Sequence, residues 1–246
     1  GSKGYDTLAD ALGAVQDGQT IVILQDAELT GDTSFHDRKD ITIQGVNDSV
    51  RIYGAAEADA KKLSLGLSGG GITLRDLTFE NVMVTVNCNS AAVETKVENC
   101  TFQNATSPNS GTDQSGVFNM TGCGQGSTLT VTDSVFQDLK RGDAAELVGI
   151  YVQAKDDALL SSITVKNSKF TNIAGTALSL RDSADITITG NEITNWAYGS
   201  KEGSGRAVRL DFSGTESQKL TFNENKLVPG TQATESYVKM DHIDET

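Results

Sequence analysis

Carboxylates are the side chains best placed to do chemistry in this chain, which contains 33 Asp and Glu residues. Hydrolysis of a glycosidic bond uses two carboxyl groups about 5–10 Å apart. The pairs Asp182/Asp185 and Asp211/Asp241 are candidates for that geometry. With so many acids on a small surface, however, such pairs arise freely by chance, so they favour a hydrolase only weakly.

Basic side chains beside acids suggest a second chemistry, in which an Arg or Lys acts as a base next to acidic groups. Arg181 and Arg209 are the candidate bases, with Asp211 nearby. Arg181 aligns with Asp211 one repeat further along the chain, and opposite charges adjacent on a sheet face form a structural ion pair. We therefore interpret this pair as structural. His36 and His242 lie near opposite ends of the chain, so we expect no shared site.

Asp- and Asn-rich turns offer oxygen ligands for calcium, but the chain has no EF-hand-like loop and no Gly-Asp nonapeptide repeat. We expect no cofactor and no bound metal, with a structural calcium ion as the less favoured alternative. Arg141-Gly142-Asp143 matches an integrin-binding tripeptide. Three residues specify little, and we interpret them as a connecting loop.

These residues must be positioned by a repeat, which is the main signal in the sequence. Six segments read apolar–x–apolar–x–turn residue, and an aromatic or aliphatic residue follows the turn by three positions, or by four in the last segment. Their starts lie 23 or 34 residues apart, at Ile72, Thr95, Leu129, Ile163, Ile186 and Leu220. A second series of short alternating strands recurs about every 30 residues, at Val84, Phe118, Ile150, Leu178, Val208 and Val238. Two series of strands with a common period predict a chain that coils back to the same place once per turn.

The turn position of the first series holds residues that tolerate a left-handed backbone, namely Asp76, Asn99, Asp133, Asn167, Gly190 and Asn223. The aromatic and aliphatic residues that follow are expected to stack inside the coil, at Phe79, Phe102, Phe136, Phe170, Ile193 and Leu227. The sequence thus predicts an all-β chain, a right-handed parallel β-helix of about eight rungs, roughly 35 Å tall. A β-sandwich is the alternative, but its turns would not repeat one motif at rung spacing.

The open end of a solenoid needs a cover, and a predicted α-helix over residues 6–17 supplies one at the N-terminus. Leu8, Leu12 and Val15 share one face of this helix, Asp6 or Thr7 caps its start, and Gly18 follows its end. No composition break divides the chain, so residues 5–246 are expected to form one domain. Residues 1–4 are interpreted as the remnant of a tag or linker.

The segments YDTLADALGAVQDGQTIVIL, DITIQG and ITLRDLTFENV resemble the pectate-lyase-like right-handed β-helix superfamily, and most of all the β-helix modules of bacterial cell-surface and secreted proteins. The resemblance covers nearly the whole chain. It implies the fold strongly and an activity hardly at all, because this fold carries lyases, hydrolases, esterases, adhesins and phage tailspikes. Of the polygalacturonase-like Asp and His pattern, only Lys155-Asp156-Asp157 has a counterpart here.

Three cysteines leave two alternatives open. Cys88 and Cys123 follow Val86 and Met120 of neighbouring rungs by two and three residues, an offset that is compatible with a disulfide. In that case Cys100, in a turn of the first series, is the one reactive thiol. The other alternative is three buried thiols that act as small hydrophobes.

Outward positions of the second series predict a polar strip along the coil. Its candidate ligand-binding residues are Tyr151, Gln153, Arg181, Arg209, Asp211 and Lys239. Tyrosine stacks on a sugar face, and the others bind hydroxyls. Arg209 beside Lys239 makes a like-charge pair in a chain of net charge −13, which hints at an acidic ligand group. An ordinary solvated face is the alternative.

The sequence therefore favours a non-catalytic, extracellular, glycan-binding module or adhesin, part of a larger bacterial surface or secreted protein. A glycan-active enzyme of the same fold and a structural spacer are the alternatives. The acidic charge disfavours nucleic acid, whose binding rests on neutralised phosphates. No apolar run is long enough to predict membrane insertion.

Overall fold

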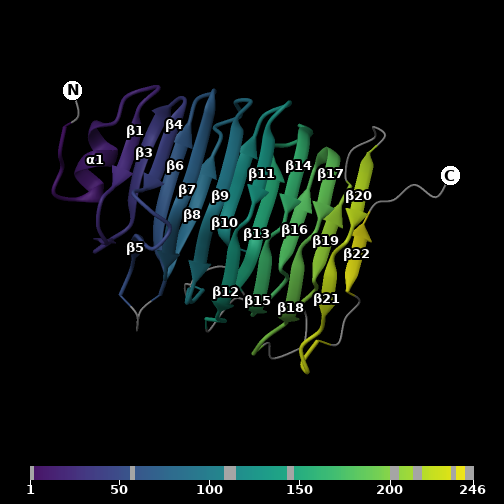
Figure 1. The fold of residues 1–246 in the computed structure, drawn as a ribbon. Helices are drawn as coiled ribbons and strands as arrows, with labels where there is room; N and C mark the ends of the chain where they lie inside the picture. Colours follow the sequence, from purple (N-terminus) through teal and green to yellow (C-terminus); the bar gives the residue numbers. More distant parts are fainter. Residues whose placement is uncertain are drawn as a thin grey trace.

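The computed structural model describes residues 3–55, 59–107, 115–142, 147–199, 205–212, 218–233 and 237–241. Within these residues the fold is all-β, with a single short helix and two long parallel sheets. Figure 1 shows the strands side by side from the N-terminal to the C-terminal end of the stack. Asp143 of the Arg-Gly-Asp tripeptide and His242 lie outside the described residues.

Two sheets contain all the strands of the described part of the chain. The larger sheet has 14 strands: β1 (Thr20–Ile23), β2 (Ala27–Glu28), β4 (Ile41–Gly45), β5 (Arg51–Tyr53), β7 (Gly71–Glu80), β9 (Glu94–Gln103), β11 (Thr128–Thr132), β12 (Val135–Leu139), β14 (Leu160–Lys166), β15 (Lys169–Ile173), β17 (Ser183–Thr189), β18 (Glu192–Trp196), β20 (Lys219–Asn223) and β21 (Lys226–Val228). The smaller sheet has eight: β3 (Thr33–Arg38), β6 (Lys61–Leu67), β8 (Val82–Asn87), β10 (Ser115–Cys123), β13 (Leu147–Ala154), β16 (Leu178–Arg181), β19 (Val208–Asp211) and β22 (Val238–Asp241).

Strand pairing follows the register that the repeat predicts. In the larger sheet the six segment starts pair in order, from Ile72 with Thr95 to Ile186 with Leu220. In the smaller sheet Val84, Phe118, Ile150, Leu178, Val208 and Val238 do the same. Every pairing is parallel, so like positions of successive repeats lie next to one another.

Alternating side chains of both sheets form one buried apolar core. At its centre the rings of Phe79, Phe102, Phe136 and Phe170 stack with centroids 4.7–4.8 Å apart. Ile193 continues the stack and is fully buried, whereas Leu227 beyond it is only partly buried. The predicted internal stack is thus confirmed.

The predicted left-handed turns are present, with one correction. Asp76, Asn99, Asp133, Asn167 and Gly190 all have φ between 49° and 68°. In the last repeat the left-handed residue is Glu224 (φ 57°), and Asn223 instead pairs with Thr189 inside the sheet. The register of Leu220 with Ile186 places the turn one residue later than predicted.

From Asn99 onward, the residue after each of the predicted left-handed turns joins a ladder, called here the buried polar ladder. Its members are Cys100, Ser134, Ser168, Asn191 and the partly buried Asn225. The backbone N–H of each member donates to the side chain of the next: Cys100 to Ser134 Oγ (3.2 Å), Ser134 to Ser168 Oγ (3.2 Å), Ser168 to Asn191 Oδ1 (2.9 Å) and Asn191 to Asn225 Oδ1 (3.0 Å). The ladder satisfies amides that the bend removes from the sheet.

The N-terminal helix is shorter than the predicted residues 6–17. It spans Leu8–Ala14 (α1), and Thr7 caps its start by accepting a hydrogen bond from the Asp10 backbone. Val15 already has extended backbone, which ends the helix ahead of Gly18. Leu8 and Leu12 are buried, and α1 packs against β3.

Candidate functional site

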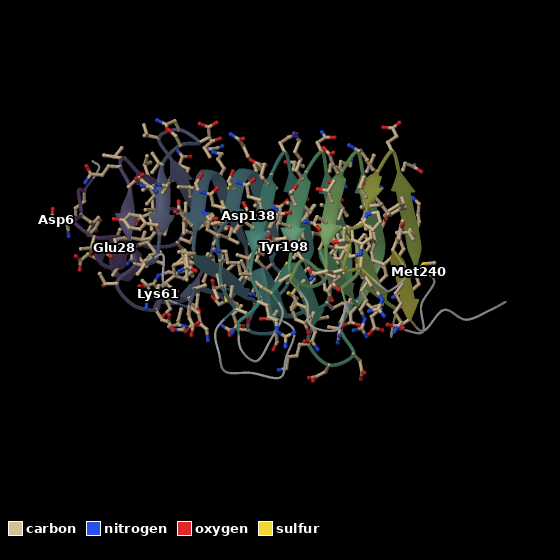
Figure 2. All side chains as sticks on the ribbon, turned by 90° about the horizontal axis from the view of Figure 1, so that it is seen from below. Asp6, Glu28, Lys61, Asp138, Tyr198 and Met240 are labelled. Atoms are coloured by element: carbon tan, nitrogen blue, oxygen red, sulfur yellow. The ribbon has the colours of Figure 1, made fainter. Side chains whose placement is uncertain are left out.

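The candidate binding residues project from the outer face of the smaller sheet in two rows, here called the polar strip. Tyr151, Ser179, Arg209 and Lys239 form one row by strand pairing. Gln153, Arg181, Asp211 and Asp241 form the other, with Arg181, Asp211 and Asp241 in direct register. Figure 2 shows polar side chains along the whole stack, between Asp6 near one end and Met240 near the other.

Two neighbouring side chains hold Tyr151 in place, one at its hydroxyl and one over its ring. Its hydroxyl donates to Gln153 Oε1 at 2.9 Å, and the guanidinium carbon of Arg181 lies 5.7 Å from the ring centroid. Gln153 is exposed and Tyr151 half-buried. A cation over the ring is favourable in itself, and it occupies one ring face on which a sugar would otherwise stack.

The two cations Arg209 and Lys239 share one carboxylate. Arg209 Nε lies 3.2 Å from Asp241 Oδ2, and Lys239 Nζ lies 2.8 Å from Asp241 Oδ1. The hydrogen bond from Lys239, together with both positive charges, holds the pKa of Asp241 below its ordinary value. Asp241 therefore neutralises one of the two positive charges, and the pair gives less reason for an acidic ligand than two unpaired cations would.

Arg181 and Asp211 form the ion pair that their alignment predicts, with Nε and Oδ2 3.9 Å apart. The strip is less continuous than expected, because two of its positions are buried. Ser179 has no exposed surface. Asn119, in the register position before Tyr151, folds back on its own strand, with its amide bonded to the N–H and C=O of Gly116 at 2.8 and 2.7 Å.

Three of the four candidate carboxylates, those of Asp185, Asp211 and Asp241, lie beside cations. Asp211 and Asp241 are neighbours in register, but a general acid needs a raised pKa, whereas that of Asp241 is lowered. Asp182 is buried, and Asp185 lies 4.0 Å from Lys219 Nζ. Asp156 and Asp157 are exposed in the turn between β13 and β14.

Metal ligands and membrane spans give two plain findings. In the described ranges, no three His, Cys, Asp or Glu side chains are grouped so as to hold a metal ion. No helix in the described part of the chain combines the length and apolar character needed to cross a bilayer.

A hollow that the sequence did not predict lies where β18 and β21 end. It has a volume of about 500 Å³ and is lined by Thr194, Asn195, Tyr198, Val228, Pro229, Gly230, Thr231 and Gln232. Tyr198 is 46% exposed. Its place is set by left-handed residues on either side, Ala197 (φ 58°) and Gly199 (φ 72°), and by the Gly199 N–H, which donates to Gln232 Oε1 at 2.6 Å.

The lining of the hollow combines one tyrosine ring, two amides and three hydroxyls, including that of Tyr198, with no charged side chain. The signal in the sequence was the exposed Tyr198-Gly199 step just after a strand. It was missed because the lining joins outward residues of two repeats, Thr194 and Val228, to the segments that follow them, which the inward-facing pattern does not describe.

Comparison with protein-family models finds no match, and a search of curated proteins finds no relative of significant similarity.

Proposed function

We propose that the chain is a right-handed parallel β-helix of about eight rungs, with α1 covering its N-terminal end, related to the pectate-lyase-like superfamily. The proposal is supported by two parallel sheets whose strands succeed one another in register at the predicted repeat positions. The burial of Leu8 and Leu12 of α1 against the first strands supports the cover.

We further propose that this β-helix is a non-catalytic glycan-binding module or adhesin of a larger bacterial surface or secreted protein. The observation that carries the proposal is the polar strip, whose Tyr151, Gln153, Arg181 and Asp211 side chains are fixed by mutual contacts. Side chains that are already ordered lose little entropy on binding, which favours recognition of flexible polymers such as glycans. Because Asp241 offsets only one of the charges of Arg209 and Lys239, the strip keeps one positive charge there, which supports an acidic group in the glycan.

A glycan-active enzyme of the same fold is the alternative, as polysaccharide lyase or glycoside hydrolase. The lowered pKa of Asp241 argues against its use as a general acid. A structural spacer is the third possibility, and it predicts no glycan binding at all.

A glycan array with neutral and acidic oligosaccharides tests the proposal, and every hit is assayed for reducing-end and unsaturated products. Tyr151→Ala and Arg181→Ala are expected to weaken binding by about 1–3 kcal/mol without lowering the melting temperature. Thr164→Ala, on the outer face of the larger sheet, is the matched control.

The effect of Tyr198→Ala on binding distinguishes a glycan site on the polar strip from one in the hollow. A loss of affinity in this variant alone moves the site to the hollow. Formation of cleavage products would show that the chain is an enzyme. An array without any bound glycan would favour the structural spacer.

A further inference from the structure

Two buried thiols meet at the edge of the smaller sheet. Cys88 directly follows β8, and Cys123 ends the neighbouring strand β10. Their sulfur atoms are 2.9 Å apart, and neither side chain has exposed surface. Both are free thiols in this structure. Two sulfurs this close in a dry interior lie within short reach of a disulfide bond, whose length is about 2.05 Å.

A bulge in β10 creates this meeting. Asn87 pairs with Thr121, so an unbroken register would set Cys88 opposite Gly122. Gly122 has φ 64°, and the register of β10 with β13 shifts between Thr121 and Cys123. The extra residue moves Cys123 into line with Cys88, and the bulge is anchored because the Ser90 N–H donates to the Gly122 carbonyl at 2.8 Å. The bulge thus explains why the two cysteines are neighbours although Cys88 follows Val86 by two residues and Cys123 follows Met120 by three.

We propose that Cys88 and Cys123 form a disulfide when the chain folds in an oxidising compartment. A low-molecular-weight disulfide of the glutathione class serves as oxidant. One cysteine thiolate attacks it, breaks its S–S bond and releases one small thiol, which leaves a mixed disulfide on the protein. The second thiolate attacks the protein-bound sulfur and releases the second small thiol. Two electrons and two protons pass to the oxidant.

The burial of the two thiols also determines the stage of folding at which the disulfide can form. The contact with the Cys88 thiol and burial both raise the pKa of Cys123 far above its ordinary value. Because the thiolate is the nucleophile, a folded and reduced chain reacts slowly, and the bond closes in the unfolded or opened chain. Cys100 stays a thiol: it is buried, its Sγ donates to the Glu98 carbonyl at 3.4 Å, and burial raises its pKa to about 12. Alkylation of Cys100, the one reactive thiol expected beside a bridge, is therefore done on the unfolded chain.

The pairing is tested by producing the chain in an oxidising compartment and alkylating it in guanidinium chloride without reductant. Intact mass is expected to show one alkylated thiol, rising to three after reduction. Peptide mapping should place the link between Cys88 and Cys123. Cys100→Ser should show none before reduction and two after; serine suits this position because Ser134 occupies it in the next repeat. Three alkylated thiols before reduction, or a link through Cys100, would overturn the proposal.

The timing is tested separately on protein made in a reducing cytosol. Folded, reduced protein is mixed with oxidised glutathione, with and without urea near the unfolding midpoint. Bond formation is expected to be at least about ten-fold slower without urea. Equal rates in the two conditions would refute closure before folding, while the pairing itself would still be decided by the peptide map.

Discussion

Truncation of the central ring of the phenylalanine stack should be among the most damaging single changes in this protein. Phe102 is fully buried, stacks on Phe79 and Phe136 at 4.8 Å each, and meets the edge of Phe118 at 6.0 Å. Loss of a buried phenylalanine side chain costs about 3–5 kcal/mol, and each aromatic pair adds about 0.5–1.5 kcal/mol beyond its buried area. With three ring neighbours, Phe102→Ala is expected at or above the upper end of that range.

The matched control is Phe170→Ala, at the same position of a later repeat. Phe170 stacks on Phe136 alone, so its loss should be smaller than that of Phe102→Ala by about 1–3 kcal/mol, the value of two aromatic pairs. Urea unfolding followed by circular dichroism gives both free energies, provided that the denaturant slope is unchanged. A loss below about 1 kcal/mol for Phe102→Ala, or no difference between the two variants, would refute the account of the stack.

Three further outcomes are expected. Ser134→Ala leaves the buried Cys100 N–H without its acceptor and should cost about 1–3 kcal/mol in urea unfolding, whereas Ser134→Cys, which restores a side chain found at this position one repeat earlier, should cost less. Glu224→Gly removes the steric strain of a side chain on a left-handed backbone (φ 57°) and should raise the free energy of unfolding by about 1 kcal/mol. A lower free energy of unfolding would show that the Glu224 side chain makes a compensating contact. The pKa of Asp241 is lower in the folded chain than in the unfolded one, so its contribution to stability is complete above about pH 5 and is lost as pH falls through the folded value. Unfolding free energies of the wild type and Asp241→Asn should therefore converge as pH falls below the folded pKa of Asp241, and a constant difference at every pH would contradict the ion pairs.

Inward-facing residues could be predicted from the sequence because a strand has a period of two and the repeat aligns one strand with the next. That reasoning placed the phenylalanine stack and the neighbouring strands of both sheets correctly. It failed at Glu224 because a glutamate carries no preference for a left-handed turn, so the asparagine beside it was chosen instead.

The candidate site was less predictable, because its properties depend on side-chain contacts between strands. Alignment gave the ion pair of Arg181 with Asp211. It did not show that Asn119 turns back on Gly116, or that Asp241 holds both neighbouring cations. The hollow beside Tyr198 arises where the ends of β18 and β21 meet the segments that follow them, and the periodic pattern does not describe those segments.

The buried polar ladder gives the stack a direction. Every amide at the bend is protected by a side chain from the strand that follows it, as the Ser168 N–H is by Asn191. Detachment of a C-terminal strand therefore exposes the bend amide of the repeat before it, because that amide loses its acceptor. Detachment of an N-terminal strand takes away only the amide that donated to the next repeat, whose own amide stays bonded. When strands detach from the C-terminal end, the Asn191 amide should therefore exchange first and the Cys100 amide last. The order of hydrogen exchange at these bends then shows how many strands have detached.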